Sequence, residues 1–113
     1  MNTMGEERYM DTLVTFLISK QQPVRAVLKP DETLDEFVAC MKRKFVNLVF
    51  TDTKGNTEIG IKIAESSVKA EEIDDSTETI ILRGECGLNF EKIKVKVELS
   101  LKDFAGFAEI TVG

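Results

Sequence analysis

The 113-residue sequence contains no histidine, no tryptophan, one tyrosine, two cysteines and two prolines. Without histidine, the chain cannot build a Ser-His-Asp or Cys-His catalytic group, and it has no imidazole to bind a metal ion. The two cysteines, Cys40 and Cys86, do not form a CxxC pair and are too few for a structural zinc site. These absences predict a protein that is not an enzyme and that uses no metal or cofactor.

The remaining reactive residue types show no catalytic arrangement. Acidic residues occur as adjacent pairs such as Glu71-Glu72 and Asp74-Asp75, whose side chains diverge, and no spacing indicates an acid/base pair. Gly84 and Gly87 are too isolated to form a phosphate-binding loop. We interpret the two cysteines as free structural thiols, because a cytoplasmic protein keeps its thiols reduced.

Long apolar runs are also absent. No run approaches the roughly 20 residues that a membrane-spanning helix needs, and the charged N-terminal segment does not resemble a secretory signal. We therefore expect a flexible tail over residues 1–11, one domain over residues 12–113, a cytoplasmic location and no membrane contact. The net charge of −5 argues against a nucleic-acid partner, since such proteins usually concentrate lysine and arginine.

One helix is strongly indicated. Thr33 followed by Glu36 is a capping box, in which the threonine hydroxyl accepts from the amide three residues later. Apolar residues then recur at helical spacing and form one stripe: Leu34, Phe37, Val38, Met41 and Phe45. The basic residues 42–44 fall in the last turn, where they favour the helix dipole and need no partner.

Most of the rest of the chain reads as strands. β-branched and apolar runs over residues 12–19 and 24–29 predict a hairpin, and further strands are expected at 46–51, 57–64 and 77–82. The two glycines in 83–89 indicate a break. Residues 90–101 then alternate strictly, which predicts a strand with lysines 92, 94 and 96 on its solvated face, and 107–112 closes the chain as another strand.

This order of elements resembles the ubiquitin-like family. The stretch from Val24 to Leu34 is similar to ubiquitin's second strand running through a proline into a threonine-capped helix, and Leu48-Val49-Phe50 resembles its third strand. The resemblance covers residues 12–84 and implies an α+β fold, a ubiquitin-like β-grasp. Residues 88–113 would then add a C-terminal β-hairpin that ubiquitin lacks.

The resemblance also implies a binding surface. Ubiquitin-like domains bind proteins through the open face of the sheet, and the matching apolar positions here are Leu13, Leu17, Val27, Val49 and Ile81. A sheet that is apolar on both faces needs a cover. Either the hairpin over residues 90–112 supplies that cover, or a protein partner or second copy in a homodimer does.

The function expected from these features is a non-catalytic protein-interaction module, a ubiquitin-like adaptor or accessory subunit that binds through a sheet face or edge. Similar proteins serve bacterial oxygenase complexes and secretion systems. The alternative is an inhibitor, encoded by a virus or mobile element, that occludes the basic surface of a host enzyme. A ubiquitin-like modifier or sulfur carrier is disfavoured, because such proteins end in Gly-Gly and this sequence ends in a single glycine.

Overall fold

The computed structural model describes residues 17–18, 20–29, 31–53, 56–88 and 91–112. Leu17 and Ile18 are helical. The elements that follow are six strands, one α-helix and one short 3₁₀ helix, in the order β1 (Gln22–Val27), α3 (Leu34–Arg43), β2 (Phe45–Phe50), β3 (Thr57–Ser66), η1 (Ala70–Glu72), β4 (Thr79–Leu88), β5 (Glu91–Ser100) and β6 (Ala105–Val112). No helix within these ranges has the length and apolar content needed to cross a membrane.

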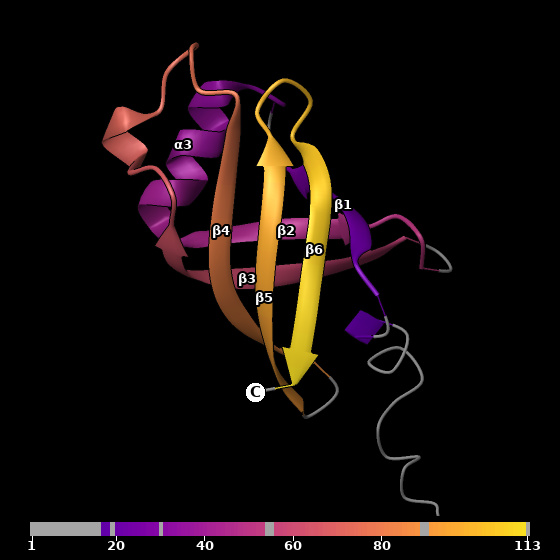
Figure 1. Cartoon of the computed structure of the whole chain (residues 1–113). Coiled ribbons are helices and arrows are strands. Elements are labelled where there is room, and N and C mark those ends of the chain that lie inside the picture. Colours follow the sequence, from indigo (N-terminus) through magenta and orange to yellow (C-terminus); the bar gives the residue numbers. More distant parts are fainter. Residues whose placement is uncertain (1–16, 19, 30, 54–55, 89–90, 113) are drawn as a thin grey trace, which may run out of the picture.

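The six strands form a closed antiparallel barrel in which each strand pairs with its neighbour in the sequence. The ring closes between the first and last strands, where Gln22 pairs with Ala108 and Arg25 pairs with Ala105. In Figure 1, β4, β5 and β6 run side by side along the molecule, and β2 and β3 cross behind them. The helix α3 lies at the end of the barrel that also holds the β5–β6 turn (Figure 1).

Alternation along the strands separates the core from the surface. In β5 the inward side chains are buried and the intervening side chains are exposed, as the strict two-residue period predicted. All six strands alternate between inward and outward side chains in this way, and their inward side chains meet in one core. A half-buried antiparallel sheet normally needs a second layer, but here the opposite wall of the barrel provides it.

A capping box has two hydrogen bonds, one accepted by the Thr33 hydroxyl and one accepted by the Glu36 carboxylate from the Thr33 amide, and the structure contains the first. The Glu36 amide donates to Thr33 Oγ1 at 3.2 Å, as the capping box predicted. The Thr33 amide, however, donates to the Asp31 carbonyl oxygen at 3.0 Å. At the other end, Lys44 takes a left-handed conformation (φ 60°) and its amide donates to the carbonyls of Cys40 and Met41, which ends the helix.

Thr33→Ala is expected to lower the free energy of unfolding by about 1 kcal/mol, because the Glu36 amide loses its hydroxyl acceptor. Thr33→Ser keeps that acceptor, so its free energy of unfolding should stay within a few tenths of a kcal/mol of the wild-type value. Urea unfolding followed by circular dichroism measures both variants. Equal stability of the alanine and serine variants would show that the cap does not support the helix.

The ubiquitin-like β-grasp prediction is wrong. A β-grasp sheet is mixed and open at its edges, whereas every neighbouring pair here is antiparallel and the ring is closed. The expected first strand, residues 12–19, is contradicted where the structure describes it: Leu17 and Ile18 are helical, and residues 12–16 and 19 lie outside the described ranges. The partners of β1 are β2 and β6. The fold is mostly β rather than α+β, and α3 is the one α-helix that is described along its whole length.

The predicted break at residues 83–89 is also wrong, because β4 continues through Leu88 and contains both glycines. Gly84 lies opposite a β-bulge in β3, between Ile63 and Glu65. A Cβ atom at Gly84 would lie 2.1 Å from the Lys62 carbonyl oxygen, so this glycine permits a close approach between strands. The C-terminal hairpin is therefore part of the barrel wall, because β5 pairs with β4 and β6 pairs with β1.

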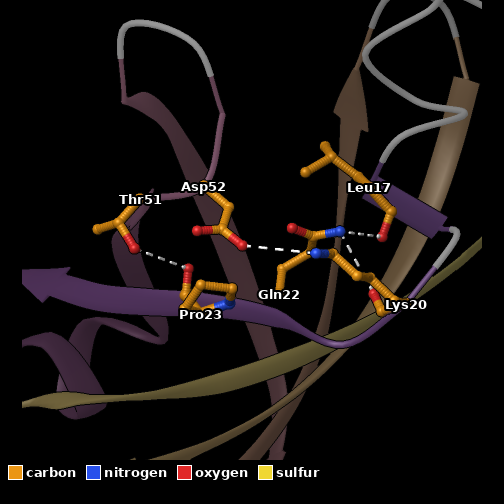
Figure 2. A network of polar contacts seen from close by, with 6 residues as sticks. All are labelled: Leu17, Lys20, Gln22, Pro23, Thr51 and Asp52. Carbon is orange, nitrogen blue, oxygen red and sulfur yellow. Dashed lines mark hydrogen bonds and ion pairs between the residues drawn. The ribbon is translucent and has the colours of Figure 1, made fainter.

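A polar network joins the residues before β1 to the barrel (Figure 2). Gln22 is fully buried, and its Nε2 donates to the carbonyl oxygens of Leu17 and Lys20, each at 3.4 Å. Lys20 Nζ lies 3.6 Å from Asp52 Oδ2 in an ion pair. These contacts fix the start of β1, including Pro23, which pairs with β6.

Candidate functional site

The residues expected to bind a partner do not gather into one described patch. Leu13 lies outside the described ranges, and the Leu17 side chain is fully buried in the core. Val27 and Val49 are half-buried on the outer face of the neighbouring strands β1 and β2. Ile81 lies on the outer face of β4, where its backbone exchanges hydrogen bonds with Ser67.

Barrel closure limits how a partner can bind. A sheet with free edges accepts an additional strand from another protein, but β1 and β6, which would be the outer strands of an open sheet, pair with each other here. Ladder pairing is one-sided over parts of the described strands, including residues 57–61 of β3, 86–88 of β4 and 109–112 of β6. These short stretches and the outer faces of the strands are the surfaces available to a partner.

A groove of about 410 Å³ runs over the outer face of β5 and β6. Its floor is made of small residues, namely Thr79, Ser100, Ala105 and Gly106. A Cβ atom at Gly106 would lie 1.7 Å from the Glu98 carbonyl oxygen, so the two strands approach closely only with glycine at this position. The remaining lining residues are larger and form the walls: Gln21, Lys96, Glu98, Phe107 and Glu109.

Phe107 stands out on this surface. Its side chain is 56% exposed, more than any other large apolar side chain in the described ranges. It points outward from β6, between Pro23 of β1 and Glu98 of β5. Phe45, which is 44% exposed, differs because it covers a glycine: a Cβ atom at Gly60 would lie 2.4 Å from its Cζ.

The charges around Phe107 are predominantly negative. Glu98 lies directly across the ladder from Phe107, and Glu109 lies two residues further along the same face of β6. Gln21 Nε2 donates to Glu109 Oε2 at 3.4 Å. Lys96 is the ladder partner of Glu109, so the groove contains two carboxylates and one ammonium group.

A second hollow of about 460 Å³ lies beside the first, over β3 to β6. Of its three cations, Arg83, Lys94 and Lys96, only Arg83 forms an ion pair with another described residue. Arg83 Nε is 4.0 Å from Glu65 Oε1, and just beyond the hollow Lys92 Nζ is 3.2 Å from Glu85 Oε1. The lysines at 92, 94 and 96 are exposed, as expected for the solvated face of a strand.

Both cysteines are free thiols. Burial raises the pKa of Cys40 above its ordinary value, although Arg43, whose Nη2 lies 3.3 Å from the sulfur, acts in the opposite direction. Burial also raises the pKa of Cys86. Cys86 falls in the segment 83–89, where a break was expected, but it lies in β4, opposite Ile93. No group of three metal-ligating side chains occurs within the described ranges.

Both thiols are expected to react slowly with iodoacetamide at pH 7.5, because a raised pKa leaves less of the reactive thiolate. The alkylation rate should climb as the pH is raised through 9. Mass spectrometry of timed samples measures the reaction, and the urea-unfolded chain provides the ordinary rate for comparison. Faster alkylation of Cys86 in the folded protein than in the unfolded chain would identify an activated thiol and contradict a purely structural role.

Sequence reasoning missed Phe107, although one signal was present. The inward positions of the last strand are Ala108 and Ile110, both buried. The two-residue period therefore places Phe107 on the outer face. A large aromatic residue at an outward position of a strand is the pattern that marks this surface.

Neither the protein-family models nor the curated proteins compared with this chain include a match.

Proposed function

We propose that this chain is a non-catalytic protein-binding module, an adaptor or accessory subunit, that holds its partner in the groove between β5 and β6. The observation that carries the proposal is the 56% exposure of Phe107 at the wall of this groove. Aromatic residues that fill a pocket at the centre of an interface supply much of the binding energy. Fully burying such a side chain contributes about 1.5–3 kcal/mol.

The scaffold under Phe107 supports this role. Both neighbours of β6 hold it through antiparallel ladders, and Pro23 beside it is fixed by the network at the start of β1 (Figure 2). A rigid aromatic side chain loses little conformational entropy when a partner covers it. The floor of small residues leaves space next to the ring for a side chain of the partner.

The inhibitor function is a second candidate, and the acidic segment after β3 favours it. Glu71, Glu72, Asp74, Asp75 and Glu78 are all exposed. Hydrogen bonds from Ser76 and Thr77 favour the charged form of the Asp74 carboxylate and lower its pKa. An acidic, exposed segment is complementary to a basic enzyme surface. Glu71→Gln with Glu72→Gln should weaken that association and leave a Phe107-dependent one intact.

Phe107→Ala is expected to weaken partner binding at least tenfold, or about 1.4 kcal/mol. To find the partner, the photo-crosslinking residue p-benzoylphenylalanine is placed at position 107 and irradiated in a lysate of the producing cell. The captured protein is identified, purified and titrated by calorimetry. Because Phe45 is an exposed phenylalanine on another face, position 45 is the matched control for both the crosslinker and the alanine variant.

Two results would contradict the proposal. One is the same capture pattern from positions 45 and 107. The other is an unchanged dissociation constant for Phe107→Ala whose amide NMR spectrum shows an intact fold.

A further inference from the structure

We infer that the groove receives a basic side chain, an arginine, from a protein partner, held between the ring of Phe107 and the carboxylates of Glu98 and Glu109. This inference rests on the function proposed above and names the chemistry that the site recognises. Its basis is the juxtaposition of an exposed aromatic ring and two carboxylates on one outward sheet face.

The ladder register brings these three side chains together. Glu98 and Phe107 are directly paired across β5 and β6, and directly paired residues have Cβ atoms about 4.5–5.5 Å apart. Glu109 follows Phe107 by two residues and therefore shares its outward face. One carboxylate thus lies across from the ring, and the other lies beside it along the strand.

The two carboxylates are not neutralised by the cations of the described barrel. No cation of the described residues lies within ion-pair distance of Glu98, and the hydrogen bond that Glu109 accepts comes from the uncharged Gln21 at 3.4 Å. Lys96 faces Glu109 across the ladder, but the two form no ion pair. Arg25, on the neighbouring strand β1, is held by Glu32 at 2.6 Å. The groove therefore keeps a net negative charge.

An arginine fits this arrangement better than other side chains. Its planar guanidinium stacks on an aromatic face and donates several hydrogen bonds to carboxylates in the same plane. The volume of about 410 Å³ lies within the range of clefts that enclose small ligands, about 300–1,000 Å³. The floor of Thr79, Ser100 and Ala105 has no long side chain to block the entering group.

The test is an NMR titration of the ¹⁵N-labelled full chain with two neutral-ended probes, Nα-acetyl-arginine methylamide and the citrulline analogue. Citrulline has nearly the shape of arginine but no charge. The arginine probe should shift the amides of Glu98 and residues 105–109 in a saturable manner, and citrulline should bind at least tenfold more weakly. Glu98→Gln and Glu109→Gln should each weaken arginine binding severalfold, and Phe107→Ala should abolish it. Glu58→Gln, an exposed position on β3, should leave it unchanged.

Several outcomes would overturn the inference. Equal binding of both probes would show that charge is not recognised, and shifts confined to residues 71–78 would place the basic ligand on the acidic segment. Amide shifts that depend on protein concentration without any probe would assign the groove to a second copy of the chain. If a captured partner depends on Phe107 while the arginine probe leaves the groove unaffected, only the arginine inference fails. If no partner depends on Phe107, it is the proposed function that fails.

Discussion

Truncation of the chain after Gly87 is expected to abolish the native fold. The cut removes β5 and β6 and therefore opens the barrel along two ladders, those of β4 and β1. It also removes core side chains that are at least 92% buried: Ile93, Val95, Val97, Leu99, Leu101, Ala108 and Ile110. Burying each of the larger ones contributes about 1.5–3 kcal/mol before entropy is subtracted, against a typical net stability of about 5–15 kcal/mol.

The truncated product should aggregate or give an NMR spectrum with collapsed amide dispersion. Gly87→Ala in the full chain is the matched control, because no atom lies within 4 Å of a Cβ built at this glycine; this variant should remain folded. A truncated chain that stays monomeric with a well-dispersed spectrum would show that β1 to β4 form an independent unit, and would refute the role of β5 and β6 in the barrel wall.

Phe37→Ala is expected to lower the free energy of unfolding by about 3–5 kcal/mol. The Phe37 side chain is fully buried, and its ring stacks on Phe104 of the β5–β6 turn with centroids 5.9 Å apart. Its removal leaves a cavity between the helix and the end of the barrel, which the surrounding strands cannot close. Urea unfolding at several wavelengths measures the loss.

Two variants make the Phe37 result specific. Phe37→Leu refills part of the cavity and should recover part of the stability. Val38→Ala changes a half-buried neighbour on the same helix. It should lower the free energy of unfolding clearly less than Phe37→Ala does. A loss below about 1 kcal/mol for Phe37→Ala would mean that the helix does not seal the core.

The parts of the fold that the sequence predicted correctly depend on local interactions. The helix was predicted because Thr33 caps it and Phe37 and Met41 lie on its buried face. The fifth strand was predicted because every second residue from Ile93 to Leu99 is apolar, and all four are buried. Both signals require contacts between residues only a few positions apart.

The parts that were missed depend on contacts between distant residues. The sequence of neither β1 nor β6 shows that the two strands pair. The residues of β1 were therefore assigned a hairpin partner in residues 12–19, just before them. Gly84 was interpreted as a break because the bulge in the adjacent strand β3, which this glycine faces, could not be known from the sequence. Resemblance to a known order of elements then selected the wrong topology, since the same order also fits a closed barrel.

Prediction of the candidate site suffered from the same error. Val27 and Val49 were correctly assigned to an outward face, because alternation alone decides that. Leu17 was assigned to the same face, but its helical conformation turns the side chain into the core. The groove at Phe107 lies mainly on the β5–β6 hairpin, which was predicted, but Gln21 joins its wall only because β1 pairs with β6.

The pairing of residue 22 with residue 108 also has a kinetic consequence. Contacts between positions so far apart in the sequence raise the contact order, and domains dominated by such contacts fold in milliseconds to seconds, much more slowly than helical bundles. Until that last ladder forms, the edges of β1 and β6 are both unpaired and can pair with another chain. The risk of aggregation in this protein therefore belongs to its folding intermediates and falls once the ring has closed.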